Sequence, residues 1–216
     1  MGLAIGVGEL AEVLEYDDAE STAAMREMYD YMNEVLAEYG VPAHNEPESF
    51  PVELNSRAEI QGFSYSCIHY LRRFYAHLQD DPDWTPEPVA EGERATDDPV
   101  IEEEMTMFSS HLLCHSDCEG HYAPIDFQEI VIDKTENERI VGGMLGSSYR
   151  LREELIEIAP ALGVKLEDGE LSDAEAERLN EEAETRDNFG IEKMVWLALY
   201  EAARLSIQYK TAIWFG

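Results

Sequence analysis

Apolar side chains recur three and four positions apart in several stretches of the chain, which is the spacing of an amphipathic helix. The stretches that this pattern predicts as helices are residues 9–16, 18–39, 68–78, 148–160, 173–185 and 191–209. Asp17 or Asp18 is placed to cap the second of them, and Ser172 with Glu175 forms a capping box before the fifth. Most of the chain is therefore predicted to be helical.

Between the third and fourth predicted helices the pattern changes to short β-like runs. Two of them, residues 105–115 and 121–127, flank the turn-rich segment Ser116-Asp117-Cys118-Glu119-Gly120, and 129–133 is a candidate third strand. Another β-like run ends the sequence at 211–215. These elements predict an α+β fold, mostly helical, in which the helices pack around a small antiparallel sheet or hairpin.

Residues 80–104 break both patterns. The segment contains four prolines and eleven acidic side chains against a single basic one, Arg94. We expect a long acidic surface loop, which Trp84 anchors to the body of the protein. Neither flank of this loop resembles a self-sufficient unit, so residues 1–216 are predicted to form a single domain.

The charge balance narrows the classes of partner. Asp and Glu total 47 and Lys and Arg total 15, so the formal net charge is −32. A surface this negative repels phosphate backbones and anionic lipids, which argues against nucleic acid and membranes and leaves a basic protein or a cation. Solubility alone, or a salty cytoplasm, would also account for the charge. Oligomeric state does not follow from these numbers.

The acidity is unevenly distributed. Segments 80–104 and 167–187 carry net charges of −10 and −8, and together hold 18 of the 32 excess negative charges. Such clustering is what an electrostatically steered interface needs, although a solvated loop and helix face would produce it too.

The sequence also predicts a cytoplasmic protein. The first residues lack the basic region of a secretory signal, and no uncharged run reaches the roughly 18 residues that span a bilayer. Three cysteines are an odd number and do not form a disulfide framework.

Histidine and cysteine are concentrated in the stretch 111–121. Imidazole and thiolate are ligands that zinc prefers, so zinc is the metal that this composition would select. The candidate ligands are His111, Cys114, His115, Cys118 and His121. A helix would place the first four on one face, whereas a hairpin, which the turn residues favour, would set His115 opposite His121. Alternatively, the cysteines are small buried hydrophobic residues and His111 is a hydrogen-bonded core residue.

A second group of candidates involves the helix over 68–78. His69 and Arg72 share one of its faces. The arginine could hold a carboxylate or phosphate ligand, or neutralise an internal acid such as Asp117 or Glu119. If His69 and Arg72 meet His115 and Asp117, the four form a candidate site for general acid–base catalysis.

Three segments carry a resemblance to known sequences: 63–75, 111–127 (HLLCHSDCEGHYAPIDF) and 142–150 (GGMLGSSYR). They resemble a group of bacterial proteins of about this length that has no established activity. The resemblance implies a bacterial cytoplasmic setting and a single domain, and it carries over no functional residue.

Two functional hypotheses follow. The first is a non-enzymatic binding protein, of an immunity or regulatory type, whose acidic face meets a basic partner. The second is a metal-binding protein or an acid–base enzyme with its site around His111–His121 and His69/Arg72.

Overall fold

The computed structural model describes residues 2–16, 18–135, 139–185 and 189–216 of the chain. In chain order its elements are β1 (Gly2–Val7), α1 (Glu9–Tyr16), α2 (Ala19–Glu38), β2 (Gly62–Ser64), α3 (Ser66–Asp80), the 3₁₀ helix η1 (Ala95–Asp97), α4 (Pro99–Met105), β3 (Gly120–Ala123), β4 (Val131–Ile132), β5 (Met144–Ser147), α5 (Ser148–Ile158), β6 (Leu166–Glu167), β7 (Glu170–Leu171), α6 (Asp173–Thr185), α7 (Gly190–Tyr209) and β8 (Ile213–Phe215). The α+β class is thus confirmed, as are the predicted helices. No helix in the described part of the chain is long and apolar enough to cross a membrane.

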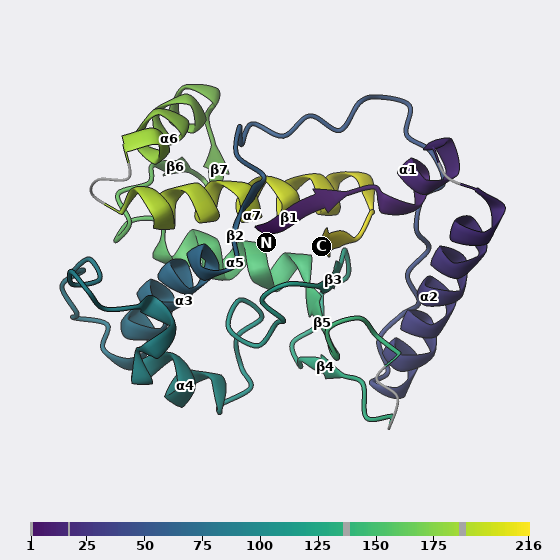
Figure 1. The fold of residues 1–216 in the computed structure, drawn as a ribbon, viewed down its shortest axis with the longest axis horizontal. Coiled ribbons are helices and arrows are strands. Elements are labelled where there is room, and N and C mark those ends of the chain that lie inside the picture. The colour runs from purple at the N-terminus through teal and green to yellow at the C-terminus, as the bar shows by residue number, and fades with distance from the viewer. Residues whose placement is uncertain (1, 17, 136–138, 186–188) are drawn as a thin grey trace.

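The main sheet joins the two ends of the chain. Its strand order is β2-β1-β8-β3-β5-β4, so the first strand and the last lie side by side within it (Figure 1). β1 and β8 are antiparallel, as are β8 and β3, but β3 and β5 run parallel. The sheet is therefore mixed, and the prediction of a purely antiparallel one was wrong in this detail. β6 and β7 form a separate small hairpin.

Helix α7 is the centre of the core. It is buried on nearly all sides and packs against α3, α5 and α6 (Figure 1). The fully buried Trp196 stacks on Tyr200 with ring centroids 4.7 Å apart, and its Nε1 donates to the Leu155 carbonyl at 2.7 Å. An indole buried this deeply needs such an acceptor, because an unpaired N–H in the core is costly.

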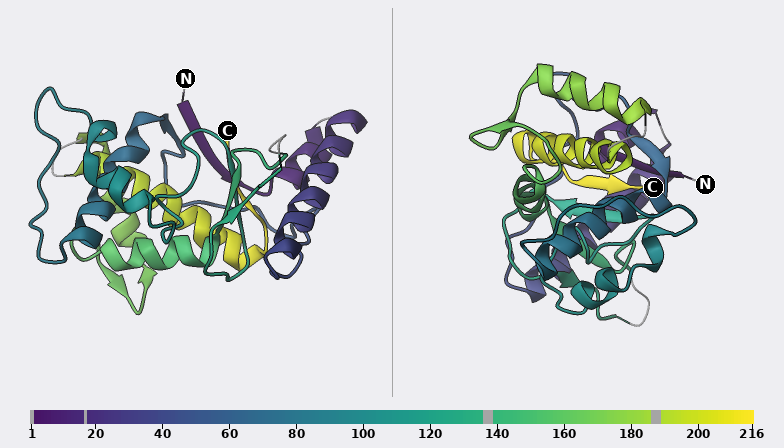
Figure 2. Two further views of the ribbon diagram at one scale, coloured as in Figure 1. Left: turned by 90° about the horizontal axis from the view of Figure 1, so that it is seen from below. Right: turned by 90° about the vertical axis from the view of Figure 1, so that its left-hand side faces the viewer.

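A second apolar cluster holds helices α1 and α2 to the sheet. One face of α2 buries Met32, Val35 and Leu36 against residues of β4 and β5, including Val131 and Leu145. The Asp18 side chain caps this helix by accepting from two backbone N–H groups, as one of the two predicted caps. Figures 1 and 2 place α1 and α2 at the opposite end of the molecule from α3, α4 and α6.

The segment before β3 differs most from its prediction. Residues 105–115 form no strand: α4 ends at Met105, and turns follow as far as Glu119. Buried Glu154 of α5 organises these turns by accepting hydrogen bonds from the backbone N–H groups of His111 and Leu112 at 2.7 Å and from the Ser110 hydroxyl at 3.1 Å. The buried carboxylate of Glu154 accepts hydrogen bonds from backbone N–H groups that would have paired with a second strand in a hairpin. The predicted hairpin is therefore wrong.

The segment 80–104 is also more ordered than predicted, because η1 and α4 lie within it. Trp84 does anchor it to α3: the indole stacks on His77 at 4.8 Å and meets Phe74 edge-on at 5.6 Å. This anchor was expected from the sequence.

Two cross-strand pairs set an aromatic ring directly over a glycine. Tyr122 of β3 lies opposite Gly146 of β5, and Trp214 of β8 lies opposite Gly6 of β1. A Cβ at residue 146 would overlap the Tyr122 ring, which is fully buried and has no room to move. The packing of the Tyr122 ring therefore requires a residue without a side chain at position 146.

We expect Gly146→Ala to lower the free energy of unfolding by about 1–3 kcal/mol, the usual cost of overpacking a core. Gly62→Ala in β2 is the matched control, because the nearest atom to its added Cβ is at an ordinary 3.6 Å. Urea denaturation measures both. Equal stability of the two variants would contradict the packing role of Gly146.

Candidate functional site

Arg72 of α3 is the buried cation in the region that the sequence singled out. Its side chain is 1% exposed, and it donates to the Leu112 carbonyl at 2.9 Å and the His115 carbonyl at 2.7 Å. It also forms an ion pair with Asp117. Of the two predicted roles, the structure confirms the neutralisation of an internal acid.

His69 completes this cluster from the same face of α3. Its Nε2 lies 2.9 Å from a carboxylate oxygen of Asp117. Burial raises the pKa of Asp117, but the hydrogen bond from His69 and the charge of Arg72 outweigh it and lower this pKa to about 2. The carboxylate is thus ionised at neutral pH and ties the turn at 116–119 to α3.

His115, the fourth catalytic candidate, contributes only its backbone to this cluster. Its ring stacks on Tyr122 at 4.1 Å, and its two nitrogens face the carbonyls of Ser116 and His121 at 3.0 and 3.2 Å. Burial lowers the pKa of His115 to about 3, so the ring is neutral. His121 points elsewhere, with Nε2 3.0 Å from Glu9 of α1.

The candidate metal ligands have other partners in the structure. His111 uses both ring nitrogens, accepting from the Ser147 N–H at 2.9 Å and lying 3.2 Å from the Gln128 carbonyl. Buried Cys114 donates to the Met105 carbonyl, while Cys118 is exposed. Within the described ranges there is no group of three or more His, Cys, Asp and Glu side chains that could hold a metal ion, so the structure gives the zinc hypothesis no support.

Replacing Arg72 tests its structural role. Arg72→Met leaves carbonyls and an acid without their partner, and we expect the free energy of unfolding to fall by about 3–5 kcal/mol, as for a broken buried pair. Arg94→Met is the control, since that side chain is 73% exposed and its pair with Asp97 is weak. Urea denaturation at neutral pH compares the two, and similar small losses would show that Arg72 is dispensable.

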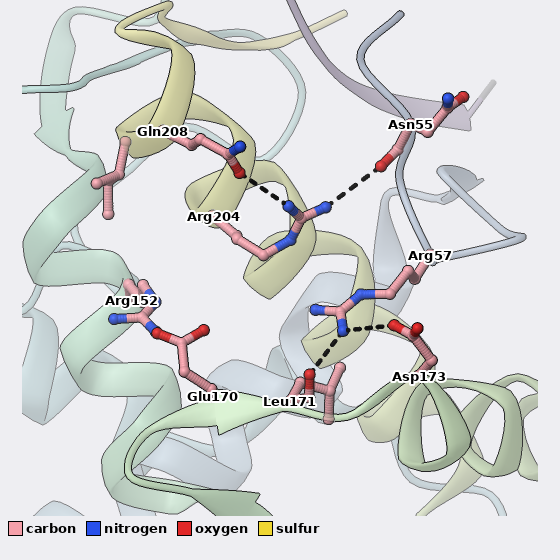
Figure 3. A pocket seen from close by; sticks show the side chains of 9 residues that line it. Asn55, Arg57, Arg152, Glu170, Leu171, Asp173, Arg204 and Gln208 are labelled. Carbon is pink, nitrogen blue, oxygen red and sulfur yellow. Dashed lines mark hydrogen bonds and ion pairs between the residues drawn. The ribbon is translucent and has the colours of Figure 1, made fainter.

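Three further arginines converge on a pocket of about 610 Å³ between α7, α5 and the β6–β7 hairpin. Figure 3 shows Arg57, Arg152 and Arg204 directed toward it from three separate segments. Arg57 and Arg204 both bond Glu201, which is 0% exposed; burial raises the pKa of Glu201, but their hydrogen bonds lower it below its ordinary value. Arg152 pairs with Glu170 at 2.7 Å. These cations are thus already engaged with acids of the chain itself.

The same is true of most basic side chains. Among the described residues, ion pairs engage Arg26, Arg57, Arg72, Arg73, Arg94, Arg139, Arg150, Arg152, Arg178, Lys193 and Arg204. Few cations remain to neutralise the exposed carboxylates. The negative charge of the surface is therefore largely uncompensated.

Segment 80–104 and helix α6 lie at one end of the molecule. We name as the acidic end the exposed carboxylates of segment 80–104 and helix α6: Asp80, Asp81, Asp83, Glu87, Glu91, Glu93, Asp97, Glu102, Glu103, Asp173, Glu177, Glu181 and Glu184. Phe74 of α3 connects the two, because it contacts Trp84 of the first segment at 5.6 Å and Phe189, next to α7, at 5.5 Å. Figures 1 and 2 show α4 and α6 at the same end.

Helix α2 carries a second acidic surface at the opposite end, which the sequence interpretation missed. Its exposed carboxylates are Glu20, Glu27, Asp30, Glu34 and Glu38. Successive members are seven, three, four and four residues apart, which places them along one side of a helix, and that signal was present in the sequence.

Comparison with known proteins identifies the family. A family model described as "Putative DNA-mimic protein" matches residues 1–215, so the chain belongs to that family. No curated protein and no solved structure matches the chain.

The family corrects both functional hypotheses. The family model describes a DNA-mimic protein. The prediction of an immunity-type or regulatory binding protein was therefore wrong, and so was the prediction of a metal-binding protein or acid–base enzyme. The residues that prompted the enzyme hypothesis are instead buried or paired within the fold. DNA-mimic proteins bind DNA-binding proteins, which agrees with the coarser expectation of a basic protein partner.

Proposed function

We propose that this protein binds the DNA-binding surface of a basic protein partner and blocks access of duplex DNA, with carboxylates of the acidic end in the place of phosphates. The observation that carries the proposal is the family match over residues 1–215. The uncompensated exposed carboxylates of the structure support it, because a cationic DNA-binding surface recognises fixed negative charge.

The spacing of the charges is compatible with this role. On α6 the exposed acids Asp173, Glu177, Glu181 and Glu184 span twelve residues of helix, or about 17 Å at the usual rise. One strand of duplex DNA has a phosphate about every 3.4 Å along its axis. The row on α6 is therefore less dense than a DNA strand, and the carboxylates of 80–104 supply additional charge at the same end of the molecule.

The internal use of the arginines favours the same role. Arg57 and Arg204 both hold the buried Glu201, although Arg57 also pairs with the exposed Asp173 at 3.2 Å and Arg152 with the exposed Glu170 at 2.7 Å. With 15 basic side chains for 47 acidic ones, most exposed carboxylates still have no cation to offset them. The chain itself is not expected to bind nucleic acid, since its charge of −32 repels phosphate. Its predicted cytoplasmic location agrees with a partner that binds DNA.

Charge-neutral variants test the proposal. The first variant removes four charges of the acidic end, by Glu102→Gln, Glu103→Gln, Glu177→Gln and Glu181→Gln. Immobilised chain captures proteins from a bacterial lysate at low salt, and mass spectrometry identifies them. We expect DNA-binding proteins to be enriched, to be eluted by duplex DNA, and to bind the variant about tenfold or more weakly, because each exposed ion pair contributes about 0.2–1 kcal/mol.

The matched control removes four charges from the opposite end, by Glu20→Gln, Asp30→Asn, Glu34→Gln and Glu38→Gln. Its net charge equals that of the first variant, so a general charge effect would weaken both alike. We expect the control to retain most of the binding. Capture of proteins that do not bind DNA, or elution that duplex DNA does not promote, would contradict the proposed function.

A further inference from the structure

A mainly apolar cleft of about 620 Å³ opens within the acidic end. Ile101 and Met105 of α4, Cys114 of the following turns and Met144 of β5 provide its apolar walls, and Phe108 lies at its mouth. His69 also lines it, so the cleft borders the cluster of Arg72 and Asp117. A cleft of this size accommodates several apolar side chains.

Apolar side chains are exposed beside this cleft. Met107 is 68% exposed and Phe108 56% exposed, directly after α4. The backbone of Phe108 has φ of 48°, in the left-handed region that an aromatic residue rarely adopts. Consecutive large apolar residues held outward at a cleft are typical of an interaction surface, whereas single exposed ones are ordinary.

The rim of the cleft is acidic. Asp97 and Glu102 line it and belong to the acidic end, and Glu103 is exposed on the same short helix. Asp98, which also lines it, is held by Arg73 at 2.8 Å and His77 at 2.9 Å. Among the described residues Glu102 and Glu103 form no ion pair, and Asp97 has only a 4.0 Å contact with Arg94. An apolar floor beside these carboxylates complements a protein segment that carries an apolar side chain between lysines or arginines.

We infer that this cleft receives an apolar anchor from the partner, a leucine or aromatic side chain flanked by basic residues. The inference rests on the proposed function, since it names the chemistry of that partner's contact. Carboxylates alone attract any basic surface, because Coulomb attraction has little geometric selectivity. The cleft adds selectivity, because only a partner with a matching apolar side chain buries it together with Met107 and Phe108.

Two synthetic helical peptides test the inference. Both carry the same number of lysines and arginines, and they differ only at positions i and i+4, which are leucine in one and glutamine in the other. Fluorescence anisotropy measures their binding to the full chain at about 150 mM salt, where exposed ion pairs are partly screened. We expect the leucine peptide to bind about tenfold or more tightly, the effect of burying one large apolar side chain.

The variant Met107→Ser/Phe108→Asn should abolish this preference. Both residues are exposed, and asparagine tolerates the left-handed backbone of residue 108, so the fold is expected to persist. Val52→Ser is the matched control, because Val52 is 52% exposed outside this cleft and its loss should change nothing. Circular dichroism verifies that both variants are folded.

Each outcome has a distinct meaning. Equal binding of the two peptides, or a leucine preference that survives Met107→Ser/Phe108→Asn, would overturn the inference and leave the proposed function intact. Absence of binding by either peptide at low salt would contradict the electrostatic basis of the proposed function as well. If the cleft binds a small apolar dye but the chain binds the two peptides equally, the cleft would be assigned to a small ligand instead. That result would also overturn the inference.

Discussion

Charge repulsion within a chain of 47 acidic and 15 basic side chains is the constraint on which the rest of this structure depends. The fold meets it by placing cations where a buried acid would otherwise be unpaired. Arg57 and Arg204 hold Glu201 on the central helix, and Arg72 joins α3 to the turns before β3. Glu201 and Asp117 are neutralised in this way, and most of the remaining negative charge is left on the surface. The same placement of arginines therefore stabilises the fold and leaves the surface strongly negative.

The position of the acidic end follows from packing as much as from charge. Phe74 lies against both Trp84 and Phe189, so one aromatic side chain holds the Pro-rich segment and the residue before α7 at the same side of α3. This packing brings together Trp84 and Phe189, which lie 105 residues apart in the sequence. The acidic end is consequently attached to the rigid core around α7, which lowers the entropic cost of presenting several carboxylates together.

Sequence patterns predicted the helices well, because helical periodicity is local and is decided by residues three and four apart. The sheet was predicted less well. β1 and β8 pair the two ends of the chain, and β5 contains Gly146, whose place under Tyr122 is evident only once the strands are paired. Pairing over such separations leaves no local signal, and the buried carboxylate of Glu154 that organises residues 110–112 could not be assigned to them from spacing alone.

The candidate sites show the same limit. The side chains at 111–121 have the composition of a metal site, yet His111, Cys114 and His115 are ordinary buried, hydrogen-bonded residues. Residue type indicated what chemistry was available, whereas burial and hydrogen bonding give these side chains partners within the fold. By contrast, the acidity of 80–104 and 167–187 could be read directly from composition, because exposed charge depends little on the fold. The acids on one side of α2 follow helical spacing and could be predicted in the same way.

Competition with DNA is the most direct test of the central claim that the acidic end takes the place of duplex DNA. A purified DNA-binding protein captured by the chain is first saturated with fluorescent duplex, and the chain is then added while anisotropy is recorded. The account predicts complete displacement of the duplex, with an apparent dissociation constant for DNA that rises in proportion to the concentration of free chain. A ternary complex, in which the duplex stays bound while the chain binds, would contradict it.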